Sequence, residues 1–191
     1  LIANGFTDKA RRQAQSNVTS LREAIVEKGI PVLATSSTCT FTLRDEYPHL
    51  LDVDNTGLRE HIELATRFLW RKLDSGQTLP LGKLPLKVVY HTPCHMEKMG
   101  WSLYTLELLR LIPGLELTVL DSRCCGIAGT YGFKRENYAT SQAIGAPLFR
   151  QIEESGADIV VTDCETCKWQ IEMSTSKRCE HPITLLANAL G

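Results

Sequence analysis

The chain has 191 residues and a formal net charge of -1, with 43% hydrophobic and 23% charged residues. This balance is typical of a globular protein with a sizeable core, and it excludes nucleic-acid binding driven by bulk charge. No apolar run approaches the roughly 20 residues that span a bilayer. The seven cysteines come without a charged-then-apolar export signal, so we expect metal-bound thiolates in a reducing compartment and not a disulfide framework.

The start of the chain predicts a helix followed by a strand. Apolar residues at spacings of three and four predict an amphipathic helix over residues 8–28. Residues 30–34 form an apolar run that predicts a short buried strand. Cys39 therefore lies just beyond the carboxyl end of a strand.

The next stretch predicts an irregular segment, a helix and a linker. Residues 40–56 are expected to be irregular because Pro48 and Asn55 interrupt regular structure. Residues 57–73 repeat apolar side chains with helical spacing and predict a second amphipathic helix. Residues 75–86 are rich in glycine and proline, which indicates a linker.

The second half of the chain predicts strands alternating with helices. These elements are expected at residues 86–91, 96–112, 115–120, 136–155, 159–162, 163–175 and 182–190. Apolar residues surround the helix at 96–112, so we expect it to be largely buried, and Pro147 is expected to kink the helix at 136–155. The alternating order predicts an α/β fold with a parallel, Rossmann-like sheet.

Five cysteines follow the strands of this predicted sheet. Cys94 follows the first strand, Cys124 and Cys125 follow the second, and Cys164 and Cys167 follow the third. Ligands of open α/β sheets bind outside the carboxyl ends of the strands, so the sequence predicts that the five thiols meet at one edge. Adjacent cysteines such as Cys124 and Cys125 cannot form an unstrained disulfide with each other.

These five thiols indicate an iron–sulfur site. Cys164 and Cys167 lie three residues apart at the start of a helix, where Asp163 can be the N-cap and the positive helix end favours thiolates. A CxxC pair alone is also typical of zinc and of thioredoxin-like redox chemistry, but zinc needs only four thiolates. Gly126, and Gly129 after it, allow backbone N–H groups to approach sulfur closely.

Other residues near this set have two possible roles each. Arg123 and Lys168 could offset the negative charge of a cluster, or could be ordinary surface cations. His91 and His95 flank Cys94 and could bind or donate to a cluster, although histidines with structural hydrogen bonds are the commoner case. One further cysteine, Cys179, lies away from any predicted strand end and is expected to be a free thiol.

The chain also predicts an internal repeat. A shift of about 127 residues aligns Gly29 with Gly156 and, after one gap, Cys39 with Cys167. Residues 1–45 would then be the second half of a unit whose complete copy is residues 86–190. Because this first copy lacks its front half and Leu1 is not a methionine, we expect the chain to be part of a longer protein.

The predicted domains follow from this repeat. Residues 1–74 would hold the partial first unit and its connecting helix. Residues 75–86 would be the linker, and residues 87–191 the complete unit.

At these cysteines the sequence resembles the cysteine-rich CCG domain family. The family pattern, a cysteine, then CCG, then CxxC, is met by Cys94, by Cys124, Cys125 and Gly126, and by Cys164 and Cys167. The family often occurs as tandem copies and includes a subunit of heterodisulfide reductase and the iron–sulfur subunits of glycolate and lactate oxidation. Stretches such as residues 3–12 and 90–95 look like its branch in anaerobic glycerol-3-phosphate dehydrogenases.

This resemblance implies a function in electron transfer. It implies that the five cysteines hold a [4Fe–4S] cluster, which is of non-cubane type in heterodisulfide reductase, with Gly126 beside it. It implies an iron–sulfur electron-transfer subunit of an oxidoreductase complex, inactive alone, that relays electrons from a flavin-containing glycerol-3-phosphate dehydrogenase subunit to menaquinone. The implied location is peripheral, on the cytoplasmic side of the inner membrane.

Three alternatives remain open at the level of sequence. The chain could be the iron–sulfur subunit of a glycolate or lactate oxidase. It could be a heterodisulfide-reductase-like enzyme that cleaves a substrate disulfide at the cluster. It could also be a zinc-stabilised module that docks a flavin subunit without redox turnover.

Overall fold

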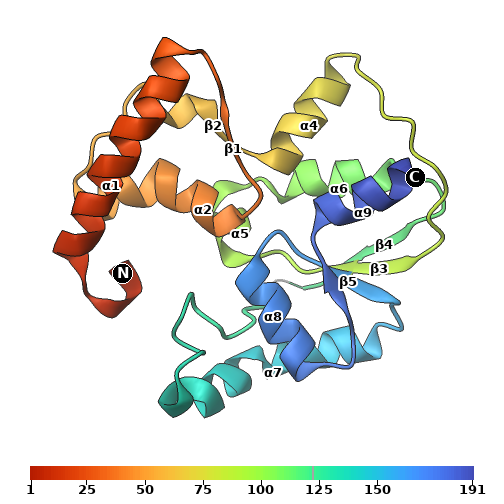
Figure 1. Ribbon diagram of the computed structural model, residues 1–191. Helices are drawn as coiled ribbons and strands as arrows, with labels where there is room; N and C mark the ends of the chain where they lie inside the picture. The colour runs from red at the N-terminus through yellow and green to blue at the C-terminus, as the bar shows by residue number, and fades with distance from the viewer. Residues whose placement is uncertain (122) are drawn as a thin grey trace.

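Two parallel sheets organise the chain in the computed structural model, which describes residues 1–121 and 123–191 (Figure 1). One sheet has two strands, in the order β1-β2, and the other has four, in the order β4-β3-β5-β6. The strands are β1 (Val32–Ala34), β2 (Ile62–Leu64), β3 (Lys87–Tyr90), β4 (Glu116–Val119), β5 (Ile159–Val161) and β6 (Cys179–Glu180). Every pairing between them is parallel. The predicted α/β class is therefore confirmed.

The helices lie on both faces of the four-stranded sheet (Figure 1). They are α5 (Cys94–Met99), α6 (Ser102–Arg110), α7 (Tyr138–Glu154), α8 (Glu165–Ser174) and α9 (Pro182–Leu190), with a 3-10 turn (Arg135–Asn137) before α7. On one face, apolar side chains of α7 and α8 pack against β5, as Ile152 and Ile171 do. On the other face, α6 and α9 pack against β3 and β5, with Leu108 and Leu185 fully buried.

The strand order sets where a ligand can bind. The chain runs from β3 outward to β4, and then returns across β3 to β5 and β6. The order therefore reverses between β3 and β5, which defines a topological switch point. Cys94 follows β3 and Cys164 follows β5, so these cysteines lie at the position where doubly wound folds bind their ligands.

The N-terminal part repeats the second half of this unit. It consists of α1 (Thr7–Arg22), β1, α2 (Ser37–Phe41), α3 (Tyr47–Leu51), β2 and α4 (Ala65–Asp74), with a 3-10 turn (Ile2–Asn4) before α1. A helix, a strand, a helix, a second parallel strand and a helix follow one another here, as they do from α7 to α9. A shift of 128 residues places β1 on β5 and Cys39 on Cys167, which agrees with the predicted repeat.

Two predictions for this N-terminal part were wrong. Residues 40–56, expected to be irregular, contain α3 and a π-helical turn at Thr42–Glu46, because Pro48 lies in the first turn of α3, where its missing N–H costs nothing. The helix expected over residues 57–73 begins only at α4. It is preceded by a 3-10 turn (Arg59–His61) and by β2, since Ile62 and Leu64 are buried where β2 pairs with β1.

The helix predicted over residues 96–112 is divided into α5 and α6. Gly100 ends α5 with a left-handed backbone (φ 68°), and Trp101 precedes α6. Trp101 lies between the guanidinium groups of Arg44 and Arg67, at 4.8 and 4.5 Å from its ring centre, and so joins the two parts of the chain. Leu103 is 57% exposed, so the expectation of a largely buried helix was only partly correct.

The remaining elements follow the predictions closely. The predicted helix over residues 8–28 is α1, continued by a π-helical turn at Glu23–Glu27. Pro147 lies inside α7, as expected. Residues 75–86 contain no helix or strand, yet Gly82 and Leu84 donate backbone hydrogen bonds to Ala189 and Pro113. Whether this segment separates two domains stays a prediction. No helix in the described part of the chain is long and apolar enough to cross a membrane.

Candidate metal centre

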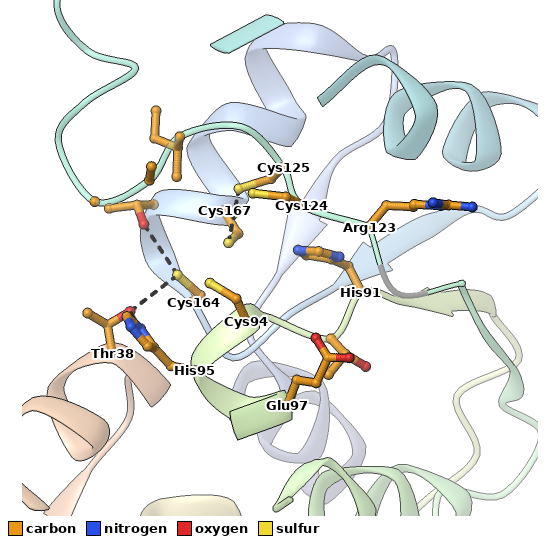
Figure 2. A pocket seen from close by; sticks show the side chains of 15 residues that line it. Thr38, His91, Cys94, His95, Glu97, Arg123, Cys124, Cys125, Cys164 and Cys167 are labelled. Carbon is orange, nitrogen blue, oxygen red and sulfur yellow. Dashed lines mark hydrogen bonds between the residues drawn. The ribbon is translucent and has the colours of Figure 1, made fainter. Parts of the chain in front are cut away.

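The five predicted cysteines line one cavity of about 260 Å³ (Figure 2). Cys94, Cys124, Cys125, Cys164 and Cys167 all contribute to its wall. Three segments far apart in the sequence thus bring their thiols together, as the order of the strands predicts. That these thiols bind a metal stays a prediction from the residue types.

Each cysteine is positioned by the element beside it. Cys94 is the first residue of α5, directly after β3, and Cys164 is the N-cap residue of α8, directly after β5. Cys167 lies in the first turn of α8. Asp163, which was expected to be the N-cap, is instead fully buried beneath the cavity; this prediction was wrong by one residue, because the carboxylate of Asp163 bonds to other elements.

The Cys124-Cys125-Gly126 turn is held against α7 by close backbone contact. Gly126 has a left-handed backbone (φ 86°), and a Cβ added there would lie 2.0 Å from the carbonyl oxygen of Ser141. Ser141 in turn donates its hydroxyl to the carbonyl of Gly126 at 2.8 Å. The Gly126 N–H donates to the sulfur of Cys124 at 3.3 Å, so this glycine does bring a backbone donor to sulfur, as its residue type suggests.

Two sulfurs lie especially close together. The Sγ atoms of Cys125 and Cys167 are 3.2 Å apart, within hydrogen-bond distance and well beyond the roughly 2.05 Å of a disulfide. The Sγ of Cys164 lies 3.3 Å from the hydroxyl of Thr166 and 3.8 Å from that of Thr38. Thr38 comes from α2, so the N-terminal part of the chain completes the wall of the cavity.

The thiols cannot ionise independently, because they are close together and partly buried. Hydrogen bonds with Cys124 and Cys167 hold the pKa of Cys125 well below its ordinary value. A hydrogen bond with Cys167 lowers the pKa of Cys164 to about 6, whereas hydrogen bonds to Cys125 and Cys164 raise the pKa of Cys167. Burial raises the pKa of Cys94. A cation bound among these sulfurs would let all of them be thiolates at once.

The two histidines beside Cys94 have different surroundings. His95 lies 3.0 Å from the hydroxyl of Thr38 through its Nδ1 and stacks on Phe41, with ring centres 4.9 Å apart. It is therefore a structural histidine, the commoner of its two possible roles. His91 is buried, and neither of its ring nitrogens has a hydrogen-bond partner among the described residues. Its ring nitrogens and the sulfurs of Cys125 and Cys167 include three ligand atoms that lie within 4.8 Å of one another.

The other two cysteines lie outside the cavity. Cys39 is exposed on α2, and Cys179 is fully buried in β6, a strand that the sequence did not predict. Of the two predicted cations, Arg123 lines the cavity, whereas Lys168 turns toward the carbonyl of Cys179 and the carboxylate of Glu180. Of these two cations, Arg123 alone is therefore placed to offset charge in the cavity.

The sequence analysis missed a buried polar network beneath the cysteines. The Asp163 carboxylate accepts hydrogen bonds from the hydroxyls of Tyr90 at 2.6 Å and Thr105 at 3.1 Å, and lies 3.5 Å from that of Thr66. The carbonyl of Asp163 also accepts a hydrogen bond from the N–H of Ser37. The network ties β3, α6 and the N-terminal part to the residue that precedes Cys164. An acidic residue beside a CxxC pair at a strand end was its only sequence signal.

The donor set fits a cluster better than a single ion. Five thiols exceed the four that a tetrahedral zinc site uses, and iron–sulfur clusters are held by cysteine thiolates. The cavity also contains a buried imidazole that the described residues leave without a partner. The residues present therefore fit an iron–sulfur group.

The comparison with protein families agrees with this geometry. Residues 88–172 match the family model described as "Cysteine-rich domain" (CCG). This part of the chain is a cysteine-rich domain of that family, and the match spans all five cavity cysteines. The resemblance drawn from the sequence is thus confirmed.

Curated relatives extend the similarity along the chain. All 191 residues are 85% identical to part of the anaerobic glycerol-3-phosphate dehydrogenase of Escherichia coli strain K12, within the subunit designated C, and cover 48% of that subunit. Lactate utilization protein A of Bacillus licheniformis is 32% identical over 146 residues, or 70% of this chain and 58% of the relative. An uncharacterized iron-sulfur protein of Methanocaldococcus jannaschii is 32% identical over 96 residues, or 49% of this chain and 19% of the relative. The chain thus spans about half the length of the first of these relatives.

Proposed function

We propose that this chain binds a [4Fe–4S] cluster through Cys94, Cys124, Cys125, Cys164 and Cys167, and that it transfers electrons in an anaerobic respiratory dehydrogenase. The single observation that carries this proposal is the meeting of five thiols in one cavity at the switch point of the sheet. The names of two relatives, an anaerobic dehydrogenase subunit and an iron-sulfur protein, support it. When bound, such a cluster accepts and releases single electrons.

The proposed partners are those of a relay. Electrons would come from a flavin-containing glycerol-3-phosphate dehydrogenase subunit and leave to menaquinone, and the chain would have no dehydrogenase activity alone. The polypeptide would supply the thiolates, the backbone N–H of Gly126 and the positive charge of Arg123. The buried sulfurs of Cys125 and Cys167 would keep one side of the cluster away from water, and the exposed Cys94 and Cys124 would give electrons access from the other side.

Metal analysis tests this proposal. Iron, acid-labile sulfide and zinc are measured on protein reconstituted without oxygen, for the wild type, for Cys125→Ser and for the matched control Cys39→Ser, whose thiol lies outside the cavity. We expect about four iron and four sulfide per chain in the wild type and the control, and a sharp loss in Cys125→Ser. Equal iron in all three proteins would contradict the assigned ligand set.

Two other functions have observations in their favour. The similarity to lactate utilization protein A favours an iron–sulfur subunit of lactate or glycolate oxidation. The compact group of His91, Cys125 and Cys167 favours a zinc-stabilised docking module. One zinc per chain without sulfide would establish the docking module. Reduction of the bound cluster by a glycerol-3-phosphate dehydrogenase subunit, but not by a lactate-oxidising partner, would select the first function.

An exposed aromatic patch supports peripheral attachment to the cytoplasmic side of the inner membrane. The patch consists of side chains that are 40–51% exposed: Tyr131, Phe133, Tyr138 and Trp169. The rings of Phe133 and Trp169 are 6.0 Å apart, and the cations Lys134 and Arg135 lie in the same segment. Aromatic rings with nearby cations are typical of surfaces that bind at the membrane interface.

Vesicle binding tests this attachment. Flotation with anionic lipid vesicles would compare the wild type with Trp169→Ser and with the control Val26→Ser, which removes an apolar side chain that is 61% exposed in the N-terminal part. We expect binding by the wild type and the control and weaker binding by Trp169→Ser. Equal flotation of all three proteins would contradict the role of the patch.

A further inference from the structure

The imidazole of His91 is a buried polar group without a partner. The residue is 2% exposed and lines the thiol cavity, and neither ring nitrogen has a hydrogen-bond partner among the described residues. A neutral imidazole has one N–H donor and one acceptor, and buried groups of this kind are ordinarily hydrogen-bonded. His91 therefore needs a partner that these residues do not supply.

The backbone fixes the position of this ring. His91 directly follows β3, and its backbone N–H donates to the carbonyl of Val161 in β5 at 2.9 Å. The chain at His91 is thus anchored between the two strands at the switch point. The side chain cannot move to solvent without breaking this contact, because it stands on the edge of the sheet that carries the cysteines.

The ring lies beside the closest pair of sulfurs. A ring nitrogen of His91 and the Sγ atoms of Cys125 and Cys167 lie within 4.8 Å of one another, and the two sulfurs are 3.2 Å apart. In Figure 2 the imidazole lies between Arg123 and the sulfur atoms, on the cavity side of the chain. The nearest groups able to accept its N–H are therefore thiolates.

We propose that His91 donates an N–H hydrogen bond to the thiolate of Cys125 or Cys167 and thereby raises the reduction potential of the bound cluster. This inference rests on the iron–sulfur site of the proposed function. Five cysteines already exceed the four ligands of a cubane cluster, which leaves the imidazole as a donor to sulfur and not as an iron ligand. A donor to a ligand sulfur stabilises added negative charge, so it favours the reduced cluster.

His95 provides an internal contrast. It comes from α5 beside the same cavity, but its Nδ1 already lies within hydrogen-bond distance of the hydroxyl of Thr38, and its ring stacks on Phe41. Both histidines flank Cys94 in the sequence. Of the two, only His91 combines full burial with two unpartnered nitrogens, which is why the inference concerns this residue alone.

Redox titration monitored by electron paramagnetic resonance tests the inference. It compares the wild type with His91→Phe, which keeps a ring without the N–H, with His91→Asn, which keeps an N–H donor, and with the control His49→Phe at an exposed position of α3. We expect full iron and sulfide in every protein. In His91→Phe the oxidised-to-reduced ratio at a fixed potential should rise at least tenfold, equivalent to about 59 mV for one electron, with a smaller shift in His91→Asn and none in His49→Phe.

Pulsed measurements on the wild type labelled with ¹⁵N-histidine do not depend on any variant folding. A weak nitrogen coupling to the cluster spin is expected for a hydrogen-bonded imidazole, whereas no coupling, or the strong coupling of a direct iron ligand, overturns the inference. An unchanged potential in a fully loaded His91→Phe also overturns it. A wild type without iron and sulfide would overturn the proposed function together with this inference, so the two failures are distinguishable.

Discussion

The hydroxyl of Tyr90 donates a hydrogen bond of 2.6 Å to Oδ2 of Asp163, and both side chains are completely buried. Tyr90 is the last residue of β3, and Asp163 lies between β5 and Cys164. The bond thus joins the two strands of the switch point directly beneath the thiol cavity. Because Thr105 and Thr66 also bond to this carboxylate, the position of Cys164 depends on side chains from three other elements.

Replacing Tyr90 with phenylalanine should destabilise the fold. The Tyr90→Phe variant removes the donor to Oδ2 of Asp163 and leaves that buried oxygen without its partner, so we expect a loss of about 1–3 kcal/mol in the free energy of unfolding. Urea denaturation measures this loss. The control is Tyr138→Phe, whose side chain is 49% exposed and which should change stability by less than about 0.5 kcal/mol. Equal effects of the two substitutions would show that the buried hydrogen bond is not important.

Replacing Asp163 with asparagine should change how stability depends on pH. Burial raises the pKa of Asp163, although hydrogen bonds from Tyr90, Thr105 and Thr66 oppose this shift. A raised pKa in the folded state means that folding retains the proton, so the stability contributed by this carboxyl is lost as pH rises from its ordinary value through the folded pKa. The asparagine has no such proton.

The stability of Asp163→Asn relative to the wild type should therefore increase with pH. The difference in unfolding free energy should change by up to about 1.4 kcal/mol per pH unit within the titration window. Urea denaturation at pH 5, 6, 7 and 8, with both proteins in the same metal state, measures this difference. A difference that stays constant across this range would contradict the raised pKa.

The sequence predicted the site well because each part of it has a local signal. Apolar runs mark β3, β4 and β5, and a cysteine or a cysteine pair follows each run. Parallel strands place their carboxyl ends together, so the convergence of Cys94, Cys125 and Cys164 follows from the alternation of strands and helices. The separation of Cys39 and Cys179 from this group was also expected from their positions in the chain.

The features that were missed depend on distant partners. Ile62 and Leu64 fit the helical spacing of residues 57–73, but they form a strand because β1 offers its edge. β6 has only two residues, too few for a periodic signal. The partners of Asp163 are scattered from Thr66 to Thr105, and no local pattern connects them.

The two cysteines outside the cavity should differ strongly in reactivity. Cys39 is exposed on α2, whereas burial shields Cys179 in β6 and raises its pKa. We expect iodoacetamide to label Cys39 faster than Cys179 in the folded protein, by on the order of 100-fold. Mass spectrometry of peptides after timed labelling measures both rates. Urea should remove the difference, and similar rates in the folded protein would contradict the burial of β6.

Replacing Gly126 with alanine should damage the centre more than the same change at Gly129. Both glycines have left-handed backbones, with φ of 86° and 67°, so both substitutions carry the roughly 1–2 kcal/mol cost of that conformation. Only at Gly126 does the added Cβ meet the carbonyl oxygen of Ser141, at 2.0 Å, whereas none of the described atoms lies within 4 Å at Gly129. We therefore expect Gly126→Ala to lose more than about 3 kcal/mol of stability and most of its iron, because the turn must leave α7. Gly129→Ala should keep its iron, and iron analysis with urea denaturation on both variants decides whether the turn needs this contact.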